Sequence, residues 1–232
     1  MHEKGFWEGM KAAAPTALGY ISIGLAFGIV AAAAGLSPLE VGLMSLLVYG
    51  GSAQFAMVAM FVSGADLGTI TLTVFLVNLR NMLMSLHATT IFTKSSLWQN
   101  IAIGTLITDE SYGVLLGENV HNKNIQTSWM HGNNLLSYSA WVGASIAGTL
   151  LGNTIPNPEN FGLDFALIAM FIGLLVSQFD AMVLTDSAKK IFLVLASVAV
   201  SFVLLSMLLS EALAVLCSTL VGCGVGVVLD ES

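Results

Sequence analysis

Residues 12–34 read AAAPTALGYISIGLAFGIVAAAA, a stretch that contains no charged side chain. A helix needs about 20 mostly apolar residues to cross the hydrocarbon core of a bilayer. Lys4 and Lys11 precede the stretch, as basic residues precede the apolar core of a signal peptide. That core spans only about 7–15 residues, so the stretch is too long for it. We therefore expect residues 12–34 to form a membrane span that is retained in the mature protein.

The same apolar character extends over the whole chain of 232 residues. Hydrophobic residues make up 56% and charged residues 9%, and the mean hydropathy is +0.87. Soluble domains usually carry roughly 25% charged residues, so this chain cannot cover a water-facing surface of ordinary composition. It also lacks the basic patch of a nucleic-acid-binding protein. The composition predicts an all-α integral membrane protein in contact with lipid.

Eight segments are long and apolar enough to be candidate spans. They lie at roughly 12–34, 39–63, 68–92, 98–117, 129–152, 163–184, 189–207 and 210–229. The fourth carries Thr105, Thr108, Asp109 and Glu110, so it is either a span or a broken, re-entrant helix. Seven spans is therefore the alternative to a bundle of about eight. The connections are too short for a soluble domain, so we expect residues 1–232 to form a single polytopic membrane domain.

Two features bear on the orientation and symmetry of these spans. With eight spans and a cytoplasmic N-terminus, the lysines gather in cytoplasmic loops except for Lys94, as the positive-inside rule requires. At an offset of 120, residues of the first half recur in the second, which indicates an internal repeat of two halves. The matching pairs are Gly28 and Gly148, Pro38 and Pro158, Gly42 and Gly162, and Leu43 and Leu163. Chance identity in glycine-rich apolar sequence explains these pairs equally well.

Charged side chains within the predicted spans are the first candidates for function. Arg80, the only arginine, falls near the middle of the third segment, and Asp109 and Glu110 fall near the middle of the fourth. An arginine at the bilayer centre costs about 2.5–3.5 kcal/mol on insertion scales, so it requires a partner. We expect one acid to pair with Arg80 and the other to remain as a titratable group. Asn78, Asn81 and Ser85 share one helix face, and Arg80 and His87 the opposite one.

The second segment has a polar centre, Tyr49-Gly50-Gly51-Ser52-Ala53-Gln54-Phe55. Glycine weakens a helix interior by about 1 kcal/mol relative to alanine. A helix interrupted here would present free backbone N–H groups that bind a carboxylate. The competing interpretation is a close packing contact in which Ser52 and Gln54 hydrogen-bond across helices.

Four motifs together resemble the AzlC family, the large subunits of bacterial branched-chain amino acid exporters. They are Gly-Leu-Ser-Pro at 35–38, the Tyr49–Phe55 core, Asn78-Leu-Arg80, and Thr108-Asp109-Glu110, and the resemblance covers essentially the whole chain. It implies export of valine, leucine, isoleucine or methionine with a small AzlD-type membrane subunit, in a bacterial or archaeal cytoplasmic membrane. Gly50 stands where the family more often has Ala, and Asn81 where it often has His.

The residues themselves suggest how a transporter would hold a zwitterionic amino acid. Arg80 and the N–H groups of Gly50, Gly51 and Ser52 would bind the carboxylate, beside Tyr49, Gln54, Asn78 and Asn81. Asp109 or Glu110 would bind the ammonium group or carry a coupled proton. A channel, a carrier of another small solute and an intramembrane enzyme using Asp109 and Asp180 remain as alternatives. No metal or cofactor motif is present, so we expect a secondary transporter that is not an enzyme.

Overall fold

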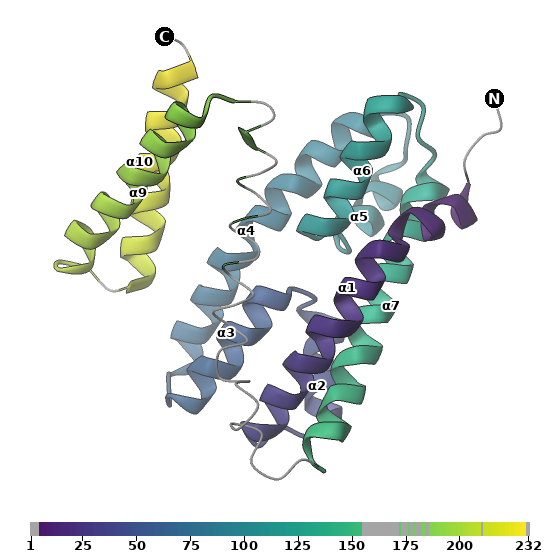
Figure 1. Ribbon diagram of the computed structural model, residues 1–232, viewed down its shortest axis with the longest axis horizontal. Helices are drawn as coiled ribbons and strands as arrows, with labels where there is room; N and C mark the ends of the chain where they lie inside the picture. The colour runs from purple at the N-terminus through teal and green to yellow at the C-terminus, as the bar shows by residue number, and fades with distance from the viewer. Residues whose placement is uncertain are drawn as a thin grey trace. The chain divides into compact units, whose positions relative to one another are not determined.

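The computed structural model describes residues 5–154, 172, 176, 179, 182–183, 186–209 and 211–230, and these residues contain helices but no strand. The helices and their bounds can be followed along the ribbon in Figure 1. They are α1 (Phe6–Ala33), α2 (Pro38–Leu47), α3 (Gly51–Val62), α4 (Leu67–Ile91), α5 (Leu97–Gly104), α6 (Asp109–His121), α7 (Thr127–Gly152), α9 (Ala188–Ser206) and α10 (Glu211–Asp230).

The all-α membrane fold predicted from the sequence is confirmed. Four described helices, α1, α4, α7 and α9, are long and apolar enough to cross a membrane. The second predicted segment consists of two helices, α2 and α3, and the fourth consists of α5 and α6. The sixth segment, 163–184, lies largely outside the described residues, as do Asp180 and the second members of three of the four repeat pairs, so the full helix count and the repeat stay predictions.

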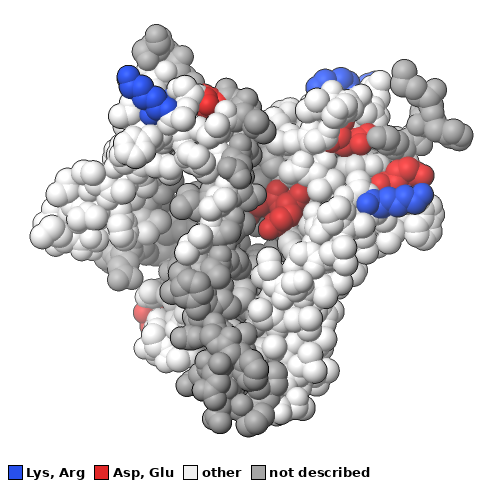
Figure 2. Space-filling view, viewed as in Figure 1, with Lys and Arg blue, Asp and Glu red and all other residues white. Residues whose placement is uncertain are grey.

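The described surface is that of a protein surrounded by lipid. Many large apolar side chains are exposed, including Leu18 on α1, Phe75 on α4 and Phe192 on α9. Figure 2 shows the Lys, Arg, Asp and Glu side chains in a few small groups, with broad uncharged areas between them. Apolar exposure on this scale is unfavourable in water but requires no compensation in hydrocarbon.

The chain divides into two compact units, which we describe separately. The first comprises Met1–Ala65 with Val77–Leu167, and the second comprises Asp66–Leu76 with Ile168–Ser232. In the second unit α9 packs closely on α10, because a Cβ on Gly222 would lie only 2.3 Å from Cγ2 of Val198. At the start of α4, the hydroxyl and backbone N–H of Thr69 donate to the side chain of Asp66, and these hydrogen bonds lower the pKa of the Asp66 carboxyl group. All the candidate site residues treated below belong to the first unit.

Helices α1 and α7 are in backbone contact within the first unit (Figure 1). A Cβ on Gly28 would lie 2.2 Å from the carbonyl oxygen of Ser145, and one on Gly148 would lie 2.3 Å from that of Leu25. The spacing Gly24-xxx-Gly28 and Gly148-xxx-Gly152 predicts such packing, because small residues let membrane helices approach closely. That interpretation of the glycine motifs is confirmed.

Gly28→Ala is therefore expected to destabilise the protein. The added methyl group would collide with backbone atoms of α7, and a backbone cannot move aside as a flexible side chain can. Overpacking of this kind costs about 1–3 kcal/mol. The measurement is the thermal unfolding midpoint in detergent. Gly19→Ala is the matched control, since Gly19 also lies in α1 and has nothing within 4 Å of its Cβ position. Equal midpoints for the two variants would contradict the packing described here.

Candidate functional site

The interruption between α2 and α3 falls at Tyr49 and Gly50, as the glycine-rich core predicts. Tyr49 has φ of +41°, the left-handed region that non-glycine residues rarely adopt. Gly50 is extended, and α3 begins at Gly51 without a side chain capping its first turn. The side chain of Asn78 lies against Gly50, since a Cβ there would be 2.6 Å from Oδ1 of Asn78. The start of α3 thus lies against α4.

Packing of the tyrosine ring holds the strained residue in place. Tyr49 is only 6% exposed, and its ring meets that of Tyr138 edge to face, with centroids 4.7 Å apart. The Tyr138 hydroxyl donates to the carbonyl oxygen of Leu46 at 2.8 Å, near the end of α2. A left-handed non-glycine residue costs about 1–3 kcal/mol and persists only where its surroundings impose it. Here α7 supplies the residue that imposes it.

The fourth segment is interrupted between Gly104 and Asp109, as its polar residues predict. Thr108 caps α6, with its Oγ1 accepting from the Ser111 N–H at 3.4 Å. Asp109 and Glu110 follow in the first turn, where the helix dipole favours negative charge. The second half of this segment, α6, therefore begins at the two acids.

Two adjacent asparagines of α7 hydrogen-bond to the two halves of this broken segment. Asn134 Nδ2 donates to the carbonyl oxygen of Ile103 in α5, and Asn133 Nδ2 donates to that of Ser111 in α6, each at 2.9 Å. Both asparagines are fully buried. In the sequence, an asparagine near a helix start gives no sign of the backbone group that it contacts.

Arg80 lies at the junction of α3, α4 and α6. Its Nη2 is 3.0 Å from Oδ2 of Asp109 and donates to Oγ of Ser52 at 2.8 Å. The side chains of Arg80 and Asp109 are 35% and 19% exposed. The predicted ion pair is confirmed, and Asp109 is the acid that forms it. The charges balance each other, so the pair adds no net charge to the junction.

Glu110 forms a separate contact with α1. The Tyr20 hydroxyl donates to Oε2 of Glu110 at 2.5 Å and lies 2.6 Å from Oγ1 of Thr108. The buried hydroxyl of Tyr49 belongs to the same group, close to Thr108 and Tyr20. Glu110 is thus the acid outside the ion pair, surrounded by two tyrosines and a threonine.

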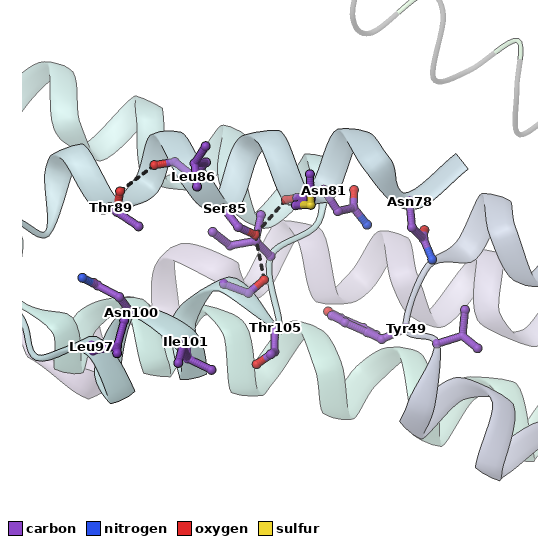
Figure 3. Close-up of a pocket in the computed structure, with 14 residues that line it drawn as sticks. Tyr49, Asn78, Asn81, Ser85, Leu86, Thr89, Leu97, Asn100, Ile101 and Thr105 are labelled. Carbon is purple, nitrogen blue, oxygen red and sulfur yellow. Dashed lines mark hydrogen bonds between the residues drawn. The ribbon is translucent and has the colours of Figure 1, made fainter. Parts of the chain in front are cut away.

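A groove of about 460 Å³ lies between α4, α5 and the link from α2 to α3. In Figure 3, Asn78, Asn81 and Ser85 come from α4, Asn100 lies across the groove near Thr89, and Tyr49 lies at the other end, near Asn78. The predicted shared face of Asn78, Asn81 and Ser85 is therefore the groove face of α4. Arg80 and His87 are not among its lining residues; His87 instead pairs with Tyr112, whose hydroxyl is 2.6 Å from Nδ1.

Gln54 is buried among protein partners. Its Nε2 donates to Oγ of Ser45 at 2.9 Å, and its Oε1 accepts from Nε1 of Trp141 at 2.7 Å. The Trp141 ring also covers Gly51, where a Cβ would lie 2.9 Å from Cη2. Gln54 and Trp141 therefore position the start of α3 from α2 and α7. Nothing local to a tryptophan in the sequence reveals such a buried amide partner.

The structure thus brings the predicted site residues together in one unit, in three adjoining groups. They are the start of α3 with Ser52, Arg80 and Asp109; the Glu110 group with Tyr20, Thr108 and Tyr49; and the groove with Asn78 and Asn81. Tyr20 and Asn100 complete the second and third groups and were not predicted. Tyr20 lies inside the first apolar stretch and Asn100 near the start of the fourth, and neither belongs to one of the four motifs.

Comparison with known proteins places the chain in a family. A family model described as AzlC protein matches residues 15–155. The chain is 33% identical over 186 residues to the inner membrane protein YgaZ of Escherichia coli (strain K12), with 75% of this chain and 74% of the relative covered. It is 31% identical over 173 residues to a membrane protein of Archaeoglobus fulgidus, with 74% of each covered.

A further relative carries a name that states a substrate. The chain is 27% identical over 180 residues to the branched-chain amino acid transport protein AzlC of Bacillus subtilis (strain 168), with 74% of this chain and 68% of the relative covered. No solved structure matches the chain. The apolar helices, the interrupted segments and these relatives agree: the chain is a multi-pass membrane transport protein and belongs to the AzlC family.

Proposed function

We propose that this chain exports branched-chain or other hydrophobic amino acids across the cytoplasmic membrane, as a proton-coupled secondary transporter that works with a small AzlD-type subunit. The observation that carries the proposal is the meeting of two interrupted helices around Arg80, Asp109 and Glu110. Discontinuous helices whose ends face a substrate recur in secondary transporters. The name of the Bacillus subtilis relative supports the substrate class.

The proposed roles follow from the contacts of each residue. Gly50, Gly51 and Ser52 begin α3 without a cap, so their N–H groups bind the substrate carboxylate, with Arg80 held beside them by Asp109. Tyr49, Asn78 and Asn81 line the adjoining groove. Gln54 keeps the start of α3 in place. Glu110 carries the coupled proton, because it is the acid that does not neutralise Arg80.

Efflux of preloaded radiolabelled leucine from cells is the test of this function. Cells that express the chain with a small AzlD-type subunit are expected to release leucine faster than cells that express neither. Expression of the chain alone shows whether the subunit is required. If purified chain in proteoliposomes, with or without that subunit, moves no leucine, isoleucine, valine or methionine, the proposed function is wrong.

A further inference from the structure

The groove described above follows α4 from the middle of the helix to its end. Because α4 has 25 residues, Leu67–Ile91, Asn78 lies next to its centre and Thr89 lies in its last turn. Both residues line the groove (Figure 3). At 1.5 Å per residue they are about 16 Å apart along the helix axis. The groove therefore extends over about half of the roughly 30 Å thickness of the hydrocarbon core.

Polar side chains line this face of α4 at every turn. Asn78, Asn81, Ser85 and Thr89 have the spacing of one helix face, and all four line the groove. Asn100 adds a carboxamide from α5 at the Thr89 end (Figure 3). The side-chain oxygens of the three asparagines are buried, and none accepts a hydrogen bond from a described residue. Buried polar groups normally have partners, so these oxygens point to a polar solute or water in the groove.

The interruptions of both broken segments also line the groove. Val48 and Tyr49 come from the link between α2 and α3, and Thr105 and Ile107 come from the link between α5 and α6. Non-helical backbone at membrane depth is tolerated where it is buried in protein or lines a water-filled cavity. The groove provides such a cavity for both links.

The lining of the groove suits passage better than tight binding. None of its lining residues carries a charge, and Arg80, Asp109 and Glu110 are not among them. Amide and hydroxyl groups offer donors and acceptors without a net charge, and a path must bind a solute weakly enough to release it. The volume of about 460 Å³ lies within the range of roughly 300–1,000 Å³ typical of small-molecule sites. A small zwitterion can therefore enter the groove and leave it.

The two walls of the groove meet partway along it. Ser85 Oγ on α4 donates to the carbonyl oxygen of Gly104 on α5 at 2.8 Å. A Cβ on Gly104 would lie 3.2 Å from Cβ of Ser85, so the helices are in close contact there. Along α4 this contact lies between an inner part of the groove, beside Asn78, and an outer part, beside Thr89. The walls are joined there by a neutral hydrogen bond, which a modest movement of α5 can break and re-form.

We propose that this groove is the outer half of the transport path, along which the substrate passes from the interrupted helices to the external face of the membrane. The inference rests on the proposed function and adds the route to it. The lysine distribution predicts a cytoplasmic N-terminus, which puts the end of α4 and Lys94 on the external side. The substrate leaves the charged groups around Arg80, passes Asn78 and Ser85, and reaches the outside beside Thr89.

The accessibility of single cysteines tests this path. The chain has two cysteines, Cys217 and Cys223, both in α10 and outside the groove, and changing both to alanine gives a cysteine-free background. In cells that also express the small subunit, Ser85→Cys should react with the membrane-impermeant thiol reagent MTSET added outside. Leu83→Cys is the matched control, because Leu83 is exposed at nearly the same depth of α4 and does not line the groove. It should react at least about tenfold more slowly, since the reactive thiolate does not form in lipid.

A second pair of variants tests whether the substrate uses the groove. Thr89 and Thr90 are adjacent and exposed, and the hydroxyl of each donates to the carbonyl oxygen three residues earlier, but Thr89 alone of the two lines the groove. MTSET should reduce leucine efflux by Thr89→Cys at least about tenfold, because the attached group narrows the path. Efflux by Thr90→Cys should stay unchanged after the same treatment.

Failure of this inference can be told apart from failure of the proposed function. If Ser85→Cys exports leucine but reacts no faster than Leu83→Cys, the groove is closed to the outside and the inference is wrong. Thr105→Cys, on the opposite wall, replaces Ser85→Cys if that variant does not fold. Labelling only in inverted membrane vesicles, or equal loss of efflux by labelled Thr89→Cys and Thr90→Cys, would also overturn the inference. Absence of leucine transport by the wild-type protein, with Ser85→Cys still labelled from outside, would refute the proposed function itself.

Discussion

Arg80→Gln is expected to reduce leucine efflux at least about tenfold and to lower the thermal unfolding midpoint. The change removes the cation 3.0 Å from Asp109 and the donor to Ser52. Breaking a buried pair costs about 3–5 kcal/mol, whereas exposed pairs contribute about 0–1 kcal/mol. For this partly exposed pair we expect the free energy of unfolding to fall by about 1–3 kcal/mol. Efflux from preloaded cells and thermal unfolding in detergent measure the two effects.

The double variant Arg80→Gln/Asp109→Asn separates stability from transport. It removes both charges, so the unfolding midpoint should return most of the way to that of the wild-type protein. Transport should remain low, because the guanidinium group at the start of α3 is still missing. Wild-type efflux by the double variant would show that the pair only holds the helices together.

Glu110→Gln is expected to abolish the response of transport to a proton gradient. The amide still accepts a hydrogen bond from the Tyr20 hydroxyl, so the contact between α1 and α6 is kept while the titratable group is lost. Exchange of internal for external leucine should continue, since it requires no net proton movement. Proteoliposomes assayed with and without a pH gradient, and in counterflow, measure both activities. We expect gradient-driven flux to fall at least about tenfold.

Tyr20→Phe is the matched control for this variant, because it removes the hydrogen bond to Glu110 and keeps the carboxyl group. It should retain coupling at a reduced rate. If Glu110→Gln responds to the gradient as the wild-type protein does, the proton is carried elsewhere, and Asp109 becomes the residue to change next.

The interrupted helices could be predicted from sequence because their causes are local. Adjacent glycines at 50–51 weaken a helix wherever they occur, and Thr108 followed by Asp109 and Glu110 forms a helix start. The ion pair could be predicted because Arg80 is the only arginine and requires an acid. The sequence does not show which of Asp109 and Glu110 is the partner of Arg80, because the pairing depends on how α6 is rotated against α4.

The contacts that support the site lie beyond local patterns. Tyr49 adopts a positive φ because Tyr138 and its surroundings hold it, although glycine is available at the next position. The binding of Asn133 and Asn134 to the broken segment depends on residues 22 and 31 positions away. Helical spacing predicts that Asn78, Asn81 and Ser85 share one face of α4, and this face lines the groove. Asn100 lines the same groove because of where α5 lies, which no local pattern reveals.

The backbone contact between α1 and α7 restricts how the first unit can change shape. A Cβ on Gly9, Gly28 or Gly148 would overlap a carbonyl group of the other helix, so the close contact runs along most of both helices. Sliding one helix along the other would force backbone atoms to collide, so the two helices move as one rigid body. We therefore expect an inward-facing and an outward-facing state to differ at non-helical links such as 48–50 and 105–108, where no ladder of helical hydrogen bonds has to break.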